Sequence, residues 1–429
     1  MNVEKQSTKF LKPSISTPQS YRHYRIGFID EFVPASNVTI VLFFPQINKI
    51  NSNIFVELEK SLEKTLIRLY PLAGRYVEDK KIIECNDEGV EFIHAKVNIK
   101  LQEFLDSEFS VVLVDEFISF ETQQQIDHFT NPLLTIQVTT FECGGVAVGV
   151  RASHRIVDAS TLCTFLNEWA FMNREESHAA EFTGLVFNSS SLFPPRGLSA
   201  MPFRAVTNDM LINYTRKKFS FSESEISNIK TKAIASGKYS NCKWSKVQLV
   251  SAIIWNAFRR VDEITNYYRR ESVLVQPISL RERMATLIPK DSCGNLWVLT
   301  YTRSRNHETT EELADLLTSS VKKTLNNFSK VSHDSKEGQT LVLNSLLHKG
   351  NFNESTYIVG ISSWCKFPFY ETDFGFGKPI WASPGTIPVK NTTVLMDDVT
   401  GKGVDAYVFL EKENVPLFKE ALECDVFGG

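Results

Sequence analysis

The spacing of apolar residues changes along the chain between the period of a helix and the run of a buried strand. From Ile54 to Leu69, apolar side chains recur every three or four residues, which predicts a helix with one apolar face. Asn37–Phe44 is a run of β-branched and aromatic residues that ends at a proline, as is typical of a buried strand. The next segments follow the same two patterns: a hairpin of strands is predicted at 133–141 and 146–152, and a helix at 160–171.

A stretch rich in serine and proline, residues 188–202, interrupts this alternation. Strand and helix patterns alternate on both sides of it, which predicts an α/β protein built from two mixed-sheet halves. We therefore divide the chain into an N-terminal domain at 1–187, a crossover linker at 188–215 and a C-terminal domain at 216–429. In the second half we expect helices at 222–235, 246–260, 308–327 and 415–423, and strands at 272–278, 296–302, 357–361 and 404–410.

Composition and charge exclude several classes of function. The 429 residues include 47 Lys and Arg against 50 Asp and Glu, a net charge of −3, so no basic surface for nucleic acid is expected. No apolar run reaches the roughly 18 residues that a membrane-spanning helix needs. The seven cysteines contain no C-x-x-C pair, which argues against a zinc site and a disulfide framework. The N-terminus is polar and lacks a secretory signal, so we expect a cytoplasmic protein without a metal.

The most informative segment places His154 at the end of an apolar strand and Asp158 four residues later. Taken alone, this H-x-x-x-D pattern fits a strand-end histidine with a local hydrogen bond as well as it fits a catalytic base. Ser153 is a poor nucleophile for His154, because successive side chains of a strand point to opposite faces. The sequence also lacks the signatures of serine hydrolases, zinc peptidases, P-loop NTPases and dinucleotide-binding enzymes.

A second unusual segment is D-F-G-F-G, residues Asp373, Phe374, Gly375, Phe376 and Gly377. Its two glycines permit a tight backbone path, and the carboxylate of the aspartate can accept hydrogen bonds from amides of its own turn. On its own, the segment is therefore explained by a well-formed turn.

Together and in this order, the two motifs resemble those of the BAHD acyl-CoA-dependent acyltransferases of plants, whose pattern is H-x-x-x-D followed by D-F-G-W-G. The resemblance covers nearly the whole chain and includes the segments 70–75, 141–145 and 247–250. It is strongest to the alkaloid O-acetyltransferases of the family. It implies two similar-sized domains of the chloramphenicol acetyltransferase-like type with a solvent channel between them. One departure is Phe376, which replaces the usual tryptophan and therefore lacks the indole N–H donor.

The resemblance also implies roles for individual residues. His154 is the expected general base, and Asp158 either orients it or forms a structural ion pair with Arg281, the role that the resemblance favours. The aspartate of the second motif, Asp373, is counted with the catalytic residues, and the rest of that loop shapes the site. Candidates for contacts with the oxyanion and the donor come from the second half: Ser362 and Trp364 for the oxyanion, and Ser245 and Lys246, at the start of a predicted helix, for coenzyme A.

The expected activity is the transfer of an acyl group from acyl-CoA to a hydroxyl of a plant specialised metabolite, with an indole alkaloid as the expected acceptor. Acetyl-CoA is the default donor, and we expect a monomer without a tightly bound cofactor. The Tyr-Phe-Gly-Asn-Cys motif of anthocyanin malonyltransferases is absent, and Ser292-Cys293-Gly294-Asn295-Leu296 occupies its neighbourhood. Two alternatives stay open: the same fold with a malonyl, tigloyl or benzoyl donor or an amine acceptor, and a catalytically silent protein that binds coenzyme A or a metabolite.

Overall fold

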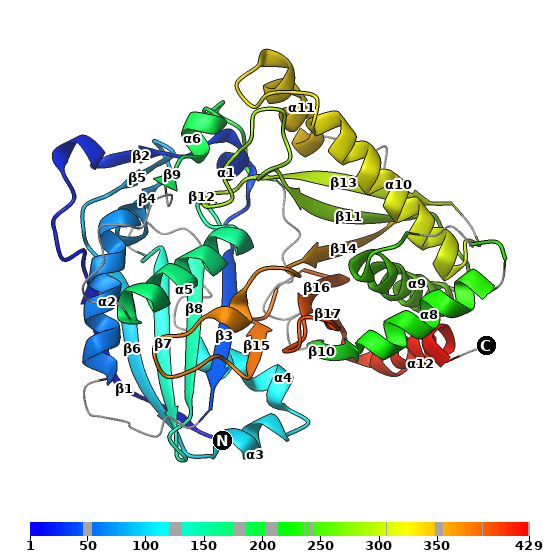
Figure 1. Ribbon diagram of the computed structural model, residues 1–429, viewed down its shortest axis with the longest axis horizontal. Coiled ribbons are helices and arrows are strands. Elements are labelled where there is room, and N and C mark those ends of the chain that lie inside the picture. The colour runs from blue at the N-terminus through cyan, green and yellow to red at the C-terminus, as the bar shows by residue number, and fades with distance from the viewer. Residues whose placement is uncertain are drawn as a thin grey trace. The chain divides into compact units, whose positions relative to one another are not determined.

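Two six-stranded mixed sheets organise the chain, each in its own unit (Figure 1). The computed structural model describes residues 1–427 except 46–53, 120–130, 175–185, 202–212, 236, 240–242, 306, 348–354 and 388. The first unit comprises residues 1–203, 288–296 and 367–386, and the second comprises 204–287, 297–366 and 387–429. The α/β class predicted from the sequence is confirmed.

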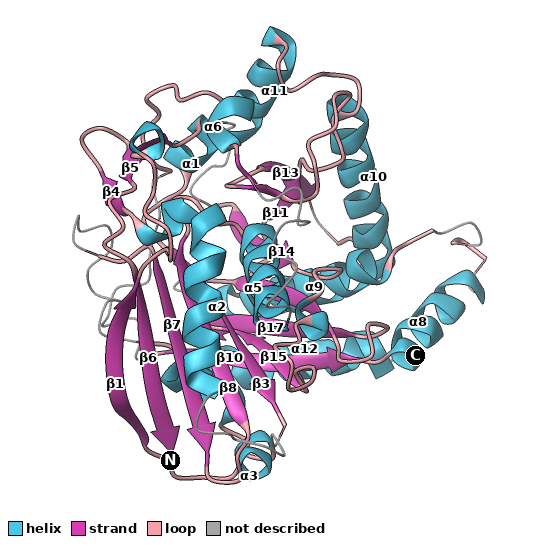
Figure 2. Ribbon diagram, turned by 60° about the vertical axis from the view of Figure 1, so that its left-hand side comes forward, coloured by secondary structure: helices cyan, strands magenta, loops and turns pink. Residues whose placement is uncertain are grey.

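The sheet of the first unit has the strand order β1-β6-β7-β8-β3-β15. The strands β7 and β8 form the predicted antiparallel hairpin, and only β6 and β7 run parallel. Helices α2 and α5 lie across one face of this sheet (Figure 2). The bounds are β1 Val3–Leu11, β6 Val90–Val97, β7 Leu134–Phe141, β8 Val146–Ser153, β3 Asn37–Phe44, β15 Trp381–Pro384, α2 Ile54–Arg68 and α5 Ala159–Arg174.

Shorter elements complete the first unit around the ends of these strands. A three-stranded sheet of order β2-β5-β4 and a parallel pair β9 and β12 are added to it. These elements are β2 His23–Arg25, β4 Arg75–Val77, β5 Ile82–Glu84, β9 Val186–Phe187, β12 Ser292–Cys293, α1 Phe28–Phe32, α3 Leu101–Leu105, α4 Ser110–Leu113 and α6 Ser189–Leu192. Single 3-10 turns lie at 19–21, 70–73, 114–117 and 369–371 of this unit.

The sheet of the second unit has the order β10-β17-β16-β14-β11-β13. The long helix α9 packs against this sheet and against α10 and α12, and it supplies the centre of a buried apolar cluster that includes Trp255 and Phe258. The bounds are β10 Tyr214–Phe221, β11 Ser272–Ser279, β13 Trp297–Ser304, β14 Tyr357–Ser363, β16 Thr392–Asp397, β17 Val404–Glu411, α8 Glu223–Ala235, α9 Lys246–Asn266, α10 Thr310–Phe328, α11 Lys336–Leu347 and α12 Val415–Phe427, with one more 3-10 turn at 412–414.

The predicted division at 188–215 does not anticipate which unit holds the D-F-G-F-G segment. That segment belongs to the first unit, together with 288–296, although both were assigned to the C-terminal domain. The physical reason is a strand pairing: β15 joins the edge of the first sheet beside β3, with Trp381 opposite Phe43 and their rings stacked at 4.9 Å. Of the predicted linker, residues 202–212 lie outside the described residues.

The described part of the chain contains no helix that is both long and apolar enough to cross a bilayer. In the same residues, no group of three His, Cys, Asp or Glu side chains is placed to hold a metal ion.

Candidate active site

His154 lies in the turn between the central strand β8 and the helix α5. Its backbone N–H donates to the carbonyl of Ser36 at 2.8 Å, so the turn is fastened to the segment that precedes β3. The residue as a whole is partly exposed, but the Nδ1 of its imidazole is buried and has no hydrogen-bond partner of normal geometry among the described residues. Burial lowers the pKa of the ring below its ordinary value of 6.5, and the charge of Asp158 opposes this shift.

Asp158 caps the N-terminus of α5. One carboxylate oxygen accepts a hydrogen bond from the backbone N of Thr161 at 2.8 Å, which is the bond that an aspartate makes as an N-cap. The other oxygen accepts from the backbone N of Leu296 at 3.3 Å. Both carboxylate oxygens thus accept from main-chain amides, as a structural role requires, and the choice between that role and an Asp-His dyad stays a prediction.

Residues 294–296 connect several parts of this site. The N–H and the carbonyl of Gly294 both bond the hydroxyl of Thr161, at 3.1 and 3.2 Å. Gly294 has a φ of +116°, and a Cβ there would come within 2.5 Å of the Ser189 side chain, so only glycine fits. The following side chain, Asn295, is fully buried and donates to the carbonyl of His154 at 2.7 Å. One short segment therefore contacts both residues of the H-x-x-x-D motif.

The D-F-G-F-G loop is held by its own aspartate. One oxygen of Asp373 accepts from the backbone N of Gly375 at 2.8 Å and of Gly377 at 3.0 Å, and both glycines have φ near +100°. Arg174 of α5 donates to the carbonyl of Asp373. These contacts support the turn that the sequence allowed, with Asp373 as the residue that closes the loop. In the contacts of the described residues, this carboxylate acts as a hydrogen-bond acceptor for the loop.

The two phenylalanines of this loop attach it to the first unit. Phe374 is buried with its ring edge-on to Trp169 of α5 at 4.7 Å, and Asn173 donates to its carbonyl at 2.7 Å. Phe376 stacks on Phe374 and meets Phe44 of β3 edge-on at 5.0 Å. The residue that replaces the usual tryptophan is therefore an aromatic packing group, partly exposed, against two other rings.

The predicted donor-binding residues have internal partners in the second unit. Ser245 is the N-cap of α9 and forms a reciprocal capping box with Gln248. The ammonium of Lys246 donates to the carbonyls of Gly401 at 2.7 Å and Gly403 at 3.1 Å and pairs with Asp397 at 2.7 Å. Both residues thus stabilise this helix start, and a contact with coenzyme A stays a prediction.

Three further candidates also lie in the second unit. Ser362 is the second-to-last residue of strand β14. Trp364 follows the end of the strand and is buried, and its backbone N donates to the carbonyl of Leu395 at 2.7 Å. Arg281 follows β11 and is buried. Their expected roles, as oxyanion donors and as the counter-ion of Asp158, stay predictions.

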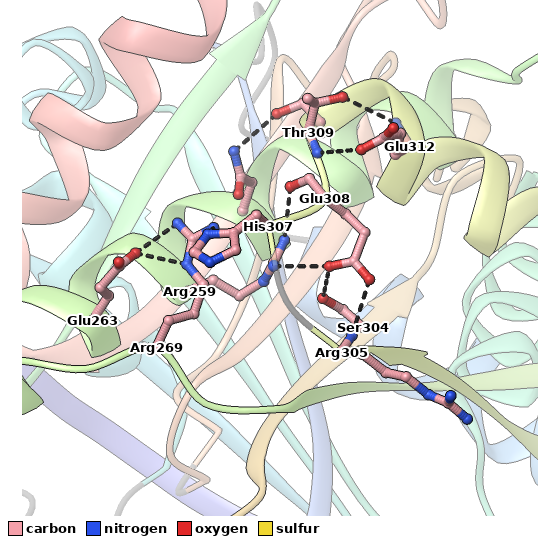
Figure 3. Close-up of polar contacts among 11 residues, drawn as sticks. Arg259, Glu263, Arg269, Ser304, Arg305, His307, Glu308, Thr309 and Glu312 are labelled. Atoms are coloured by element: carbon pink, nitrogen blue, oxygen red, sulfur yellow. Dashed lines mark hydrogen bonds and ion pairs between the residues drawn. The ribbon is translucent and has the colours of Figure 1, made fainter.

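A dense polar cluster at the start of α10 has a structural explanation (Figure 3). Buried Arg259 bonds both the carbonyl, at 3.2 Å, and the carboxylate, at 3.1 Å, of Glu308. The same carboxylate accepts from the hydroxyl of Ser304 at 2.7 Å, and Thr309 caps the helix by accepting from the backbone N of Glu312. The cluster joins α9 to β13 and α10 through paired charges, so we assign it to stability and not to catalysis.

Comparison with known proteins decides the family. The Transferase family model matches residues 1–425. The chain is 30% identical to vinorine synthase of Rauvolfia serpentina, over 97% of this chain and 96% of that one. The crystal structure of vinorine synthase superposes with a TM-score of 0.83 at 28% identity, covering 97% of this chain and 96% of that chain. The chain belongs to the BAHD acyltransferase family.

As a BAHD protein, the chain is an acyl-CoA-dependent acyltransferase. Its relatives in this family use different donors and acceptors. It is 30% identical, over the full length of both chains, to a pelargonidin glucoside malonyltransferase of Salvia splendens. It is 29% identical to stemmadenine O-acetyltransferase of Catharanthus roseus, over 96% of this chain and 94% of that one. Family membership therefore leaves open which acyl group this BAHD enzyme transfers.

Sequence reasoning missed Asn295, whose side chain donates to the carbonyl of His154, and Asp30, which accepts from the same side chain. One signal for Asp30 was available: it lies within Phe-Ile-Asp-Glu-Phe, an acidic residue among large apolar ones, in what proves to be a fully buried helix α1. In the sequence, Asn295 stands out only as part of a segment that differs from a malonyltransferase motif. Its distance along the chain from His154 does not indicate that the two residues are in contact.

Proposed function

We propose that this protein transfers an acetyl group from acetyl-CoA to a hydroxyl of an alkaloid, with His154 as general base and without an acyl-enzyme. The observation that carries the proposal is the His154 imidazole: its pKa is lowered by burial, it follows a central strand, and the neighbouring carboxylate accepts hydrogen bonds from main-chain amides. Such a ring is neutral near pH 7 and can accept a proton.

The reaction needs this one base. An alcohol is a weak nucleophile, so His154 accepts its proton as the alcohol oxygen attacks the thioester carbonyl. The tetrahedral intermediate then collapses, the C–S bond breaks, and the imidazolium returns its proton to the departing thiolate, whose thiol has a pKa of about 8.5. Ser153, which directly precedes His154 in the sequence, is buried, and its hydroxyl accepts from the backbone N of Arg155 at 3.3 Å. This contact supports a mechanism without a serine nucleophile.

The choice of acetyl as donor and of an alkaloid as acceptor is supported by the family relatives. Stemmadenine O-acetyltransferase is named for an acetyl group and an alkaloid, whereas the Salvia relative is named for malonyl transfer. A malonyl donor is therefore the second candidate, and a tigloyl or benzoyl donor or an amine acceptor stays an alternative. The expectation of a cytoplasmic monomer stays a prediction.

The proposal is tested by incubating the protein with acetyl-CoA and a panel of alkaloid alcohols while free thiol is measured. We expect thiol release that requires both an alcohol and the protein, with acetyl-CoA preferred to malonyl-CoA for the same acceptor. Faster turnover of malonyl-CoA would overturn the choice of donor. A melting temperature raised by coenzyme A with no thiol release from any acceptor would support the silent binding protein instead.

The rate should depend on pH in the direction set by the lowered pKa of His154. Because burial favours the neutral ring, the base stays competent as the pH falls from 8 to about 6.5, the ordinary pKa of histidine. We expect kcat/KM for the alcohol to be level over that range and to fall only at lower pH. A pH–rate profile checks this, and a midpoint above 7 would contradict it.

A further inference from the structure

The position of the His154 ring depends on its main chain. The buried Nδ1 has no hydrogen-bond partner of normal geometry among the described residues, although the side chain of Asn295 lies close enough to favour the charged ring. The main chain, in contrast, is held on both sides: the N–H donates to Ser36, and the carbonyl accepts from the Nδ2 of Asn295 at 2.7 Å. These two bonds fix the direction of the Cα–Cβ bond, and with it the range of positions that the imidazole can reach.

Asn295 is in turn fixed by a buried carboxylate. Its Nδ2 donates to the Oδ1 of Asp30 at 2.8 Å as well as to the carbonyl of His154, so both hydrogens of the amide are used. The backbone N of Asn295 donates to the same carboxylate oxygen, also at 2.8 Å. The amide cannot be reversed, because its oxygen would then face the carboxylate. Asp30 therefore sets the orientation of the group that holds His154.

Asp30 itself is completely buried, and no cation pairs with it in the described part of the chain. Its second oxygen accepts from the backbone N of Gly27 at 2.9 Å and from the hydroxyl of Ser189 at 2.5 Å, and that hydroxyl also bonds the phenol of Tyr24 at 2.8 Å. Burial raises the pKa of Asp30 to about 6. Burying a carboxylate without a counter-ion costs free energy. In return, the Asp30 carboxylate holds hydrogen-bond donors from three segments that are far apart in the sequence.

We infer that Asn295, oriented by Asp30, is a positioning residue for the His154 base. The inference rests on the proposed function, because it matters for turnover only if His154 is the base. The structure separates this role from general stability. Replacing the side chain of Asn295 leaves two main-chain bonds of the same segment in place, from its own N to Asp30 and from Leu296 N to Asp158.

The test compares Asn295→Ala with a matched control, Thr17→Val. Thr17 also bonds a buried carboxylate of the first unit: its hydroxyl donates to Asp87 at 2.6 Å, and its backbone N donates to the second oxygen at 2.9 Å. Thr17→Val thus removes one buried side-chain hydrogen bond, leaves the main-chain one, and touches neither His154 nor its partners. We expect Asn295→Ala to lower kcat at least tenfold with KM for acetyl-CoA changed less than threefold, and Thr17→Val to keep kcat within twofold.

A kcat for Asn295→Ala within twofold of the parent, or an equal loss in Thr17→Val, would overturn the inference. If Asn295→Ala does not fold, Asn295→Ser replaces it, since a single short hydroxyl cannot bond both Asp30 and His154, and the same loss is expected. Measurement of His154→Ala in parallel separates the two hypotheses. An inactive His154→Ala beside an active Asn295→Ala removes only the positioning role, whereas an active His154→Ala removes the proposed function as well.

Discussion

Replacement of His154 by alanine is expected to lower kcat at least about a thousandfold while the protein remains folded. General acid–base catalysis by a positioned side chain contributes roughly 10²- to 10⁴-fold, and in the proposed reaction His154 acts twice, as base toward the alcohol and as acid toward the thiolate. The Nδ1 of the ring has no hydrogen-bond partner of normal geometry among the described residues, so loss of the ring removes few polar contacts. Thiol release under saturating substrates measures the effect.

A second histidine of the same unit provides the matched control. His94 of β6 also has a lowered pKa, and it contacts Glu59 of α2 at 3.2 Å. His94→Gln is expected to reduce the melting temperature but to leave kcat within about twofold, because His94 belongs to the packing of α2 on the sheet. More than a tenth of the parent activity in His154→Ala would contradict the proposed mechanism.

The second large effect is expected at Asp158, and there it is expected in stability. Asp158→Ala removes the N-cap of α5, which is worth about 0.5–2 kcal/mol. It also leaves the buried N–H of Leu296 without its acceptor, which costs about 1–3 kcal/mol. We therefore expect the free energy of unfolding to fall by about 1.5–5 kcal/mol. Activity should fall with it, because the turn that carries His154 is directly attached to this helix start. Urea unfolding and thiol release measure the two quantities.

The amide variant distinguishes the two roles considered for Asp158. Asp158→Asn keeps an oxygen for the backbone N of Thr161, so a structural role predicts a smaller loss of stability and of activity than in Asp158→Ala. A dyad with His154 predicts instead that kcat falls as strongly in Asp158→Asn as in Asp158→Ala, although the asparagine variant keeps more of its stability. Thr309→Ala, which removes the N-cap of α10 in the second unit, controls for the loss of a helix cap and should leave kcat unaltered.

Local patterns predicted several elements whose apolar side chains face a core, but not the largely buried strands β6 and β16. The strand β3 and the helix α2 begin and end within a residue or so of the predicted bounds, because their apolar positions face a core. β1 escaped prediction because it is an edge strand: all but its two end residues are exposed, so its sequence shows no apolar alternation. The helix α11 was missed as well, and only four of its residues are buried.

The candidate site was predictable where a motif stood in the sequence and unpredictable where only a fold contact gives a residue its meaning. His154 and Asp158 were identified by spacing and resemblance. The partners of their main chain come from α1 and from 294–296, and no pattern along the chain connects Asp30 to Asn295. Asp373 was read as a catalytic candidate from resemblance, whereas its hydrogen bonds to Gly375 and Gly377 follow from the turn chemistry that its own sequence allows.

The pairing of β15 with β3 bears on the order in which the protein can be assembled. During synthesis, β3 leaves the ribosome early, but the strand that covers its open edge is among the last to emerge. Until then, a row of backbone amides and carbonyls beside Phe43 and Phe44 is available to other chains, which is the setting in which nascent proteins aggregate. Premature termination before residue 381 would produce a fragment with that edge permanently open, so the N-terminal half of the chain does not by itself contain every strand of its sheet.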